Sequence, residues 1–350
     1  MSDNKKQILL PICTPPITSY QQIALPLTVA MNNTTAINWF FSNYVQVLCI
    51  NRKHYFEKEN NDNALHYNFY SPNITSVEPI NQISIDSSEQ LFFFIRSQFV
   101  KDIIDDGWYI YTHADMFYID GSNGFGFAHY PHDLLIYGYD DENIYIYMYN
   151  KYKLASHKVK IDNFLKGYFS EYCDRNKYKN RAMLIKTNNE KCRVNLEKIR
   201  WYMQDYLNGT ETFARENPNI FNPDSLTVNG VDTYREFDEL LDYAIINEYK
   251  DLRRSDLYCF YEHKKVMFDR VIYLRDNGFL SISDKLLDEF EMVKKQAEIL
   301  MFLGLKMNTL ENPERKNFTL LRMKDNIKII KEHEVSAWNR YIDENKEVLG

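Results

Sequence analysis

The sequence predicts an α+β protein in which a mixed α/β half with an antiparallel sheet precedes an all-helical half. Up to about residue 150, short runs of aromatic and β-branched residues alternate with Gly, Asn and Asp, a pattern typical of strands joined by turns. From about residue 190, apolar residues recur at spacings of three and four, which is the helical period. We therefore expect two domains, 1–189 and 190–350.

The N-terminal region is expected to begin with an extended segment over 7–13, followed by a helix within 19–31. Pro26 lies inside that helix, where proline removes a hydrogen-bond donor and clashes with the preceding turn. The helix is therefore expected to start late, near Ala24, or to be kinked. A second helix or apolar run is expected over 36–48.

The next region is polar and rich in Asn over 51–86 and predicts only weak strands. Ser87 begins a third helix, with Gln90 at the capping-box position and Gly107 beyond its end. Three strands are expected after this helix, over about 108–119, 132–139 and 143–150.

Apolar stripes define the helices of the second half, at about 196–207, 237–244, 286–304 and 323–341. A further helix carries several charged residues, for which we expect a solvated face with i,i+4 ion pairs. These residues are Glu262, His263, Lys264, Lys265 and Arg270.

Composition excludes several classes of protein. A net charge of −7 over 350 residues disfavours nucleic-acid binding, which needs a concentrated basic surface. No run approaches the roughly 20 apolar residues that span a bilayer, and the N-terminus lacks a signal-peptide pattern. The 5 cysteines show no C-x-x-C spacing, which favours reduced thiols in a cytoplasmic protein. We expect no cofactor, because the Gly-rich stretch 121–126 does not fit a phosphate-binding motif.

The most informative stretch lies between 128 and 150. His132 opens an apolar run that ends at Gly138, turn residues follow at 140–143, and a second strand ends at Asn150. This pattern predicts a β-hairpin that returns Asn150 beside His132. An imidazole with a neighbouring side chain that orients it is the usual device of general acid–base catalysis.

The segment 132–141, His-Asp-Leu-Leu-Ile-Tyr-Gly-Tyr-Asp-Asp, resembles the histidine motif of the butirosin-biosynthesis acyltransferase N-terminal family. That family is a branch of the papain-like, C39-peptidase-like fold. Residues 108–119 resemble the strand before the histidine, and 261–270 resemble a helical segment of the C-terminal half. The resemblance implies transfer of an acyl group from the phosphopantetheine arm of a carrier protein to a small amine, through a cysteine thioester, in natural-product biosynthesis.

The nucleophile departs from this family pattern. A papain-like fold places cysteine at the start of the first long helix, where the helix end lowers the thiol pKa. Ser19 and Tyr20 occupy that position, whereas Cys13 comes too early and Cys49 too late. Ser19 is therefore a native serine nucleophile, or catalysis has been lost, or a cysteine has been replaced. The structural alternative for Ser19 is a solvated helix cap.

We assign Tyr20, Trp108 and Asp115 to the substrate side of the predicted cleft, although Asp115 also fits a surface position on its strand. Nearby imidazoles and carboxylates suggest a metal site, but the two histidines that straddle Pro131 are poorly placed to converge, so we expect no metal. The residues considered for that site are His113, Asp115, His129, His132 and Asp133.

Two functions are therefore expected, with the enzyme first. One is an acyltransferase in which Ser19 takes the acyl group, His132 moves the proton and Asn150 holds the ring. The alternative is a non-catalytic accessory protein of the same fold that binds a carrier protein or a small molecule. A peptidase that trims leader peptides shares the fold, but it needs the same missing cysteine. The charged helix at 261–270 provides a second possible role, as a basic dock for an acidic carrier protein.

Overall fold

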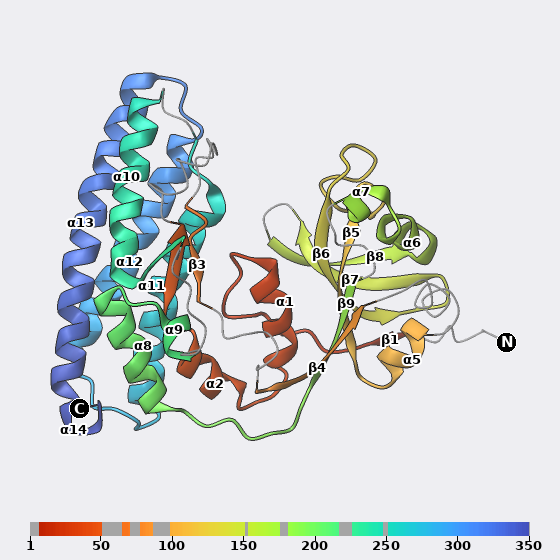
Figure 1. Ribbon diagram of the computed structural model, residues 1–350, viewed down its shortest axis with the longest axis horizontal. Helices are drawn as coiled ribbons and strands as arrows, with labels where there is room; N and C mark the ends of the chain where they lie inside the picture. The colour runs from red at the N-terminus through yellow and green to blue at the C-terminus, as the bar shows by residue number, and fades with distance from the viewer. Residues whose placement is uncertain are drawn as a thin grey trace. The chain divides into compact units, whose positions relative to one another are not determined.

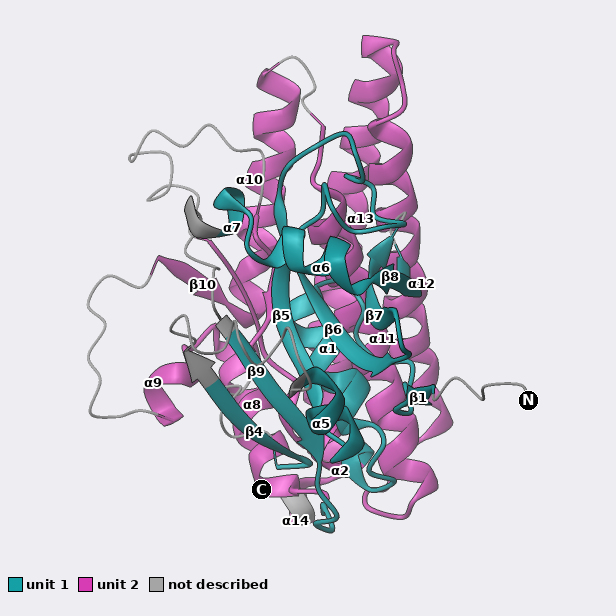
Figure 2. Cartoon of the chain, turned by 90° about the vertical axis from the view of Figure 1, so that its right-hand side faces the viewer, with its two compact units in different colours: residues 1–37, 73–193 teal, residues 38–72, 194–350 magenta. Residues whose placement is uncertain are grey.

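The computed structural model describes residues 7–50, 65–70, 78–86, 99–150, 153–175, 181–216, 226–247 and 251–349 (Figure 1). The chain forms two compact units, one made of 1–37 and 73–193 and the other of 38–72 and 194–350 (Figure 2). The sequence division at 189/190 lies close to the junction at 193/194. The two divisions differ at 38–72, which joins the second unit.

The first unit is built on an antiparallel sheet whose strand order is β4-β9-β5-β6-β7-β8, with β1 also paired to β6. The strands are β1 (Ile8–Leu9), β4 (Ile80–Asp86), β5 (Tyr109–Asp115), β6 (Pro131–Tyr139), β7 (Asn143–Asn150), β8 (Lys153–Lys160) and β9 (Arg181–Thr187). The helices of the unit are α1 (Gln21–Ala30), α5 (Phe99–Asp105), α6 (Ile161–Tyr168) and α7 (Glu171–Arg175). The α+β class is therefore confirmed at this level.

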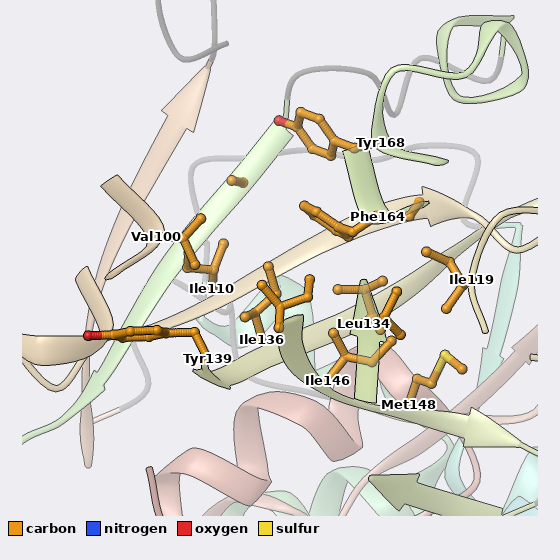
Figure 3. Packing of buried hydrophobic residues seen from close by; sticks show 14 of the residues in the cluster. Val100, Ile110, Ile119, Leu134, Ile136, Tyr139, Ile146, Met148, Phe164 and Tyr168 are labelled. Atoms are coloured by element: carbon orange, nitrogen blue, oxygen red, sulfur yellow. The ribbon is translucent and has the colours of Figure 1, made fainter. Parts of the chain in front are cut away.

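The hydrophobic core of the first unit lies between one face of the sheet and helices α5 and α6 (Figure 3). Leu134 and Ile136 of β6 point into it together with Ile146 of β7, because alternate residues of a strand share a face. Phe164 of α6 packs on them. Helix α1 contributes nothing to this cluster and contacts β5, β6, β7 and β9, so it packs on the other face.

The β6–β7 hairpin confirms the central prediction, because its strands start and end within a residue of the expected bounds. Strand β8 was not predicted. Among the described strands it pairs only with β7, at the end of the strand order, and its sequence, KLASHKVK, is mostly polar. Lysines on an edge strand discourage pairing with other chains, and they also remove the apolar alternation that identifies a strand.

Several helix boundaries differ from expectation. Helix α1 begins at Gln21, not near Ala24, and continues through Pro26. The apolar run after it divides into α2 (Ala36–Asn43) and a strand, β2 (Val47–Ile50). The predicted cap at 87–90 lies outside the described residues.

The second unit is mainly helical but contains a three-stranded sheet, which corrects the all-helical expectation. Its strands are β2, β3 (Asn68–Phe69) and β10 (Thr227–Asn229), paired in the order β10-β2-β3. The short strands contain too few residues to display a period of two, so the helical pattern around them dominated the prediction. The helices are α2, α8 (Leu196–Asn208), α9 (Thr212–Glu216), α10 (Thr233–Ile246), α11 (Arg254–Asp276), α12 (Asp284–Met307), α13 (Pro313–Glu344) and α14 (Lys346–Leu349), with a 3₁₀ turn at Gly230–Asp232.

Candidate functional site

His132 is the second residue of β6, and 43% of its side-chain surface is exposed. Its Nδ1 accepts a hydrogen bond from the backbone N–H of Asp133 at 3.0 Å. The carboxamide nitrogen of Gln21, the first residue of α1, contacts the same Nδ1. Because both partners are donors, we assign Nδ1 as the acceptor, so neutral His132 carries its proton on Nε2.

The Gln21 side chain is buried and joins the two strands of the hairpin. Its Nε2 donates to the carbonyl oxygen of Asp133 at 3.0 Å, and its Oε1 accepts from the backbone N–H of Tyr149 at 2.5 Å. These two backbone bonds fix which end of the carboxamide faces His132. The paired register of β6 and β7 runs from Tyr139 to Leu135. Beyond it, the carboxamide supplies the hydrogen bonds that a peptide group would supply.

A carboxamide therefore faces His132 at the start of α1, where a papain-like fold would hold its cysteine. A carboxamide is not a nucleophile, and all of the Gln21 contacts described above serve to join α1, β6 and β7. Gln21 could not be recognised from the sequence, because a glutamine at a helix start is an ordinary polar residue unless its distant partners are known.

Ser19 lies two residues before α1, in the segment that leads into the helix, and it is half-buried. The cap position itself is held by Tyr20, whose carbonyl accepts the N–H groups of Ile23 and Ala24. Trp108 directly precedes β5 and packs beside the core, with the Lys186 ammonium 5.7 Å from its ring. Tyr20 thus caps a helix and Trp108 packs on the core, so a role of either residue in substrate binding stays a prediction.

Asn150 ends β7, as expected for a residue that returns beside His132. Its Oδ1 is buried, and within the described part of the chain it has no hydrogen-bond partner. The described residues likewise show no hydrogen bond between Asn150 and His132. An orienting bond from Asn150 to the imidazole therefore stays a prediction.

Asp115 ends β5 with its side chain fully buried, so it is neither a surface residue nor an exposed polar wall. Its Oδ1 accepts the backbone N–H groups of Phe117 and Tyr130, both at 3.1 Å. Its Oδ2 accepts from Nδ1 of His129 at 2.8 Å and from Oγ of Ser170 at 2.6 Å. Asp115 thus orients His129 rather than His132.

The His129 ring is held between two aromatic rings. Phe117 stacks on it with ring centroids 4.0 Å apart, and Tyr172 stacks with centroids 4.3 Å apart and planes within 4°. The imidazole lines a pocket of about 450 Å³ whose other lining residues are Tyr118, Lys166, Phe169, Ser170, Glu171 and Tyr172. From the sequence, His129 was a candidate only as a metal ligand, because the residues that complete this site come from β5 and from around α7, which are distant in the chain.

The charged residues of α11 are not a docking surface. His263, Lys264 and Arg270 are buried in the second unit, and burial lowers the pKa of each. The Lys264 ammonium pairs with the buried Glu334 carboxylate at 2.9 Å. Only the pair of Lys265 and Asp269, at 2.6 Å, matches the expected i,i+4 pattern on the surface.

The physical reason for this correction is helical spacing. The side chains of His263, Lys264 and Arg270 lie on one stripe of the helix with apolar residues, because they are separated from them by three or four positions. Those apolar residues are Phe260, Met267, Val271 and Leu274. The resulting contacts are internal: the Arg270 guanidinium donates to the carbonyls of Phe41 and Tyr44, and His263 Nε2 to that of Val45. Neither a solvated face nor a basic dock describes these three residues.

No family model matches the chain, and no curated protein matches it. Across the residues that the structure describes, no helix is long and apolar enough to cross a membrane. No group of three or more His, Cys, Asp or Glu in the same ranges is placed to hold a metal ion.

Proposed function

We propose that the protein is an accessory member of the papain-like, C39-peptidase-like group in which the His132 site does not catalyse acyl transfer. In this proposal its first unit binds an acyl group presented on the phosphopantetheine arm of a carrier protein and does not transfer it. The resemblance at 132–141 supports the choice of ligand. Free thiols at all five cysteines are compatible with the cytoplasmic location that this role implies.

The observation that carries the proposal is the carboxamide of Gln21 at the start of α1, in contact with Nδ1 of His132. Acyl transfer through a covalent intermediate needs a nucleophile within hydrogen-bond reach of its base. Here the side chain in contact with the imidazole is a buried hydrogen-bonding group. The exposed part of His132 remains available to donate a hydrogen bond from Nε2 to a carbonyl oxygen of the ligand.

The test compares native protein with Gln21→Cys, Ser19→Cys and the double variant Gln21→Cys/His132→Ala. Each is incubated with acyl-loaded carrier protein and a panel of small amines, and intact-protein mass spectrometry follows acyl adducts while amide products are assayed separately. We expect no adduct and no amide with native protein. Gln21→Cys should acquire an adduct that the double variant does not form, because the thiol then lies beside an imidazole.

Binding is measured in parallel by fluorescence anisotropy of a labelled acyl-pantetheine carrier. His132→Ala should lower affinity only about five- to tenfold, the value of one hydrogen bond from Nε2, because binding requires no proton transfer. Amide formation by native protein, with an acyl group on Ser19, would restore the acyltransferase as the function. Failure of native protein to bind any acyl-loaded carrier would remove the accessory role.

A further inference from the structure

Asp115 and His129 form a dyad that is separate from the His132 contacts. The buried carboxylate accepts four hydrogen bonds, two of them on the oxygen that receives Nδ1–H of His129. A carboxylate accepts but does not donate, so it fixes the proton of neutral His129 on Nδ1 and leaves the lone pair on Nε2. No hydrogen bond to Nε2 is found among the described residues.

The ring of this histidine is fixed in orientation as well as in tautomer. Phe117 and Tyr172 cover its two faces, and Tyr118 meets it edge-on at 5.8 Å. With both faces covered, only the ring edge is free to meet a ligand, and 29% of the side chain remains exposed. A base held in one orientation does not lose rotamer freedom when a substrate binds, which is the advantage of a preorganised site.

The pocket beside the ring contains a lysine, and its serine hydroxyl is not placed to act as a nucleophile. Lys166 lines the pocket, and within the described ranges it forms no ion pair. Glu171 is the carboxylate among the lining residues. The Ser170 hydroxyl also lines the pocket, but it donates its proton to Asp115, so it is not activated by His129. Water is therefore the nucleophile that this arrangement suits.

We propose that this pocket is a hydrolytic site for small carboxylic esters, with His129 as the general base and Asp115 as its positioning residue. Nε2 of His129 takes a proton from water while the water oxygen bonds to the ester carbonyl carbon. The ester C–O bond then breaks, and the imidazolium returns the proton to the departing oxygen, giving acid and alcohol. Lys166 provides positive charge for the oxyanion that forms on the carbonyl oxygen.

The experiment uses the full chain and p-nitrophenyl acetate as the probe. We compare native protein with His129→Gln, Lys166→Ala and Asp115→Asn, and we use the exposed residues His333 and Lys153, as His333→Gln and Lys153→Ala, for matched controls. General-base catalysis contributes about 10²–10⁴-fold, so His129→Gln should reduce kcat/KM by at least about 100-fold. Lys166→Ala should lower kcat more than it raises KM, and both controls should equal native protein.

Asp115→Asn needs a readout that a general loss of structure would not mimic. We expect a loss of at least about tenfold in kcat, as a positioning residue allows, with the Nδ1–H proton signal of His129 displaced in a ¹H–¹⁵N spectrum whose other amide signals stay in place. If Asp115→Asn does not fold, the comparison of native protein with His129→Gln and with the control His333→Gln decides the proposal on its own. Hydrolysis by native protein no faster than by His129→Gln would overturn the proposal, as would a pre-steady-state burst showing an acylated side chain.

Discussion

His129 and His132 lie three residues apart around the start of strand β6, yet the hydrogen bonds at their Nδ1 atoms run in opposite directions. At His132, Nδ1 accepts hydrogen bonds from an amide and a carboxamide, which places the proton on Nε2. At His129, Nδ1 donates to a buried carboxylate, which places the lone pair on Nε2. The same side chain is therefore a hydrogen-bond donor at one site and a base at the other.

The difference comes from what each neighbouring element supplies. Helix α1 brings Gln21 to His132, and the end of β5 brings Asp115 to His129. Both rings have a carboxylate nearby, because Oδ1 of Asp133 lies 3.5 Å from Nδ1 of His132, but only Asp115 accepts a hydrogen bond from its histidine. We expect proton chemistry at His129 and binding at His132.

Loss of the Gln21 carboxamide should have the largest effect on stability, because this one side chain contacts His132 and also bonds to both strands of the hairpin. In Gln21→Ala the carbonyl of Asp133 and the N–H of Tyr149 each lose a partner, at about 1–3 kcal/mol per group. We expect the free energy of unfolding to fall by about 4 kcal/mol, measured by urea denaturation. The control is Gln22→Ala, an exposed glutamine of the same helix, which should change it by less than about 0.5 kcal/mol. Equal effects from both would show that Gln21 does not connect the strands.

Asp140, at the other end of β6, is a reference carboxylate that orients no histidine. Burial raises the pKa of Asp140, but hydrogen bonds from Lys158, from Asn143 and from the N–H of Glu142 outweigh burial, and the pKa lies well below its usual range. A depressed pKa in the folded state stabilises the protein above the unfolded value, near 4, and the contribution is lost as the pH falls below it.

Asp140→Asn should therefore reduce the free energy of unfolding by about 2 kcal/mol at pH 7. The difference in free energy of unfolding between native protein and the variant should shrink as the pH falls from about 5 toward 2. Protonation then neutralises Asp140 in the native protein, whereas Asn is neutral at every pH. Chemical denaturation of both proteins across this range measures it. A difference that stayed constant down to pH 2 would mean that the charge of Asp140 is not the cause.

A smaller effect is expected at the His129 site when one of four donors to Asp115 is removed. The Ser170 hydroxyl donates to Asp115 and accepts from the backbone N–H of Tyr172 at 3.2 Å, so Ser170→Ala should reduce the free energy of unfolding by about 1.5 kcal/mol, while the other three bonds to Asp115 persist. Thermal unfolding with calorimetry is sufficient to detect it. A loss several times larger would indicate that Ser170 supports the pocket through more than these two bonds.

The smallest effect is expected at Asn150, which tests whether an orienting partner exists at His132. Its Oδ1 has no partner in the described part of the chain, so Asn150→Ala should change the free energy of unfolding by less than about 1 kcal/mol. The imidazole signals of His132 should also be unchanged by NMR. Displacement of those signals would establish Asn150 as the residue that orients His132.

Features that depend on neighbouring residues were predictable from the sequence, and features that depend on distant residues were not. The β6–β7 hairpin was predicted closely because its apolar strands and its Asp-rich turn follow one another directly in the sequence. The edge strand β8 was missed because solvent-facing strands need no apolar residues. The burial of Lys264 was missed because its partner, Glu334, is seventy positions away.

The candidate site shows the same limit. His132 and its strand were recognised from local sequence, but Gln21, which contacts the ring, lies 111 positions earlier. Asp115 was selected as a polar residue of the cleft, whereas its role depends on His129 and on Ser170, 55 positions later. Residue types were therefore predictable, and the pairs that they form were not.

The placement of 38–72 in the second unit has a consequence for synthesis on the ribosome. The first unit has all of its strands once residue 193 has emerged, but β2 must wait for β10, because Leu48 pairs with Asn229, 181 positions later. At about 5–20 residues per second the wait is roughly 10–40 s. Until then Val47–Ile50 can pair with β3, but it lacks the strand on its other side and helix α10, which also contacts it. Nascent chains paused between 193 and 227 should accordingly be those that chaperones hold most strongly.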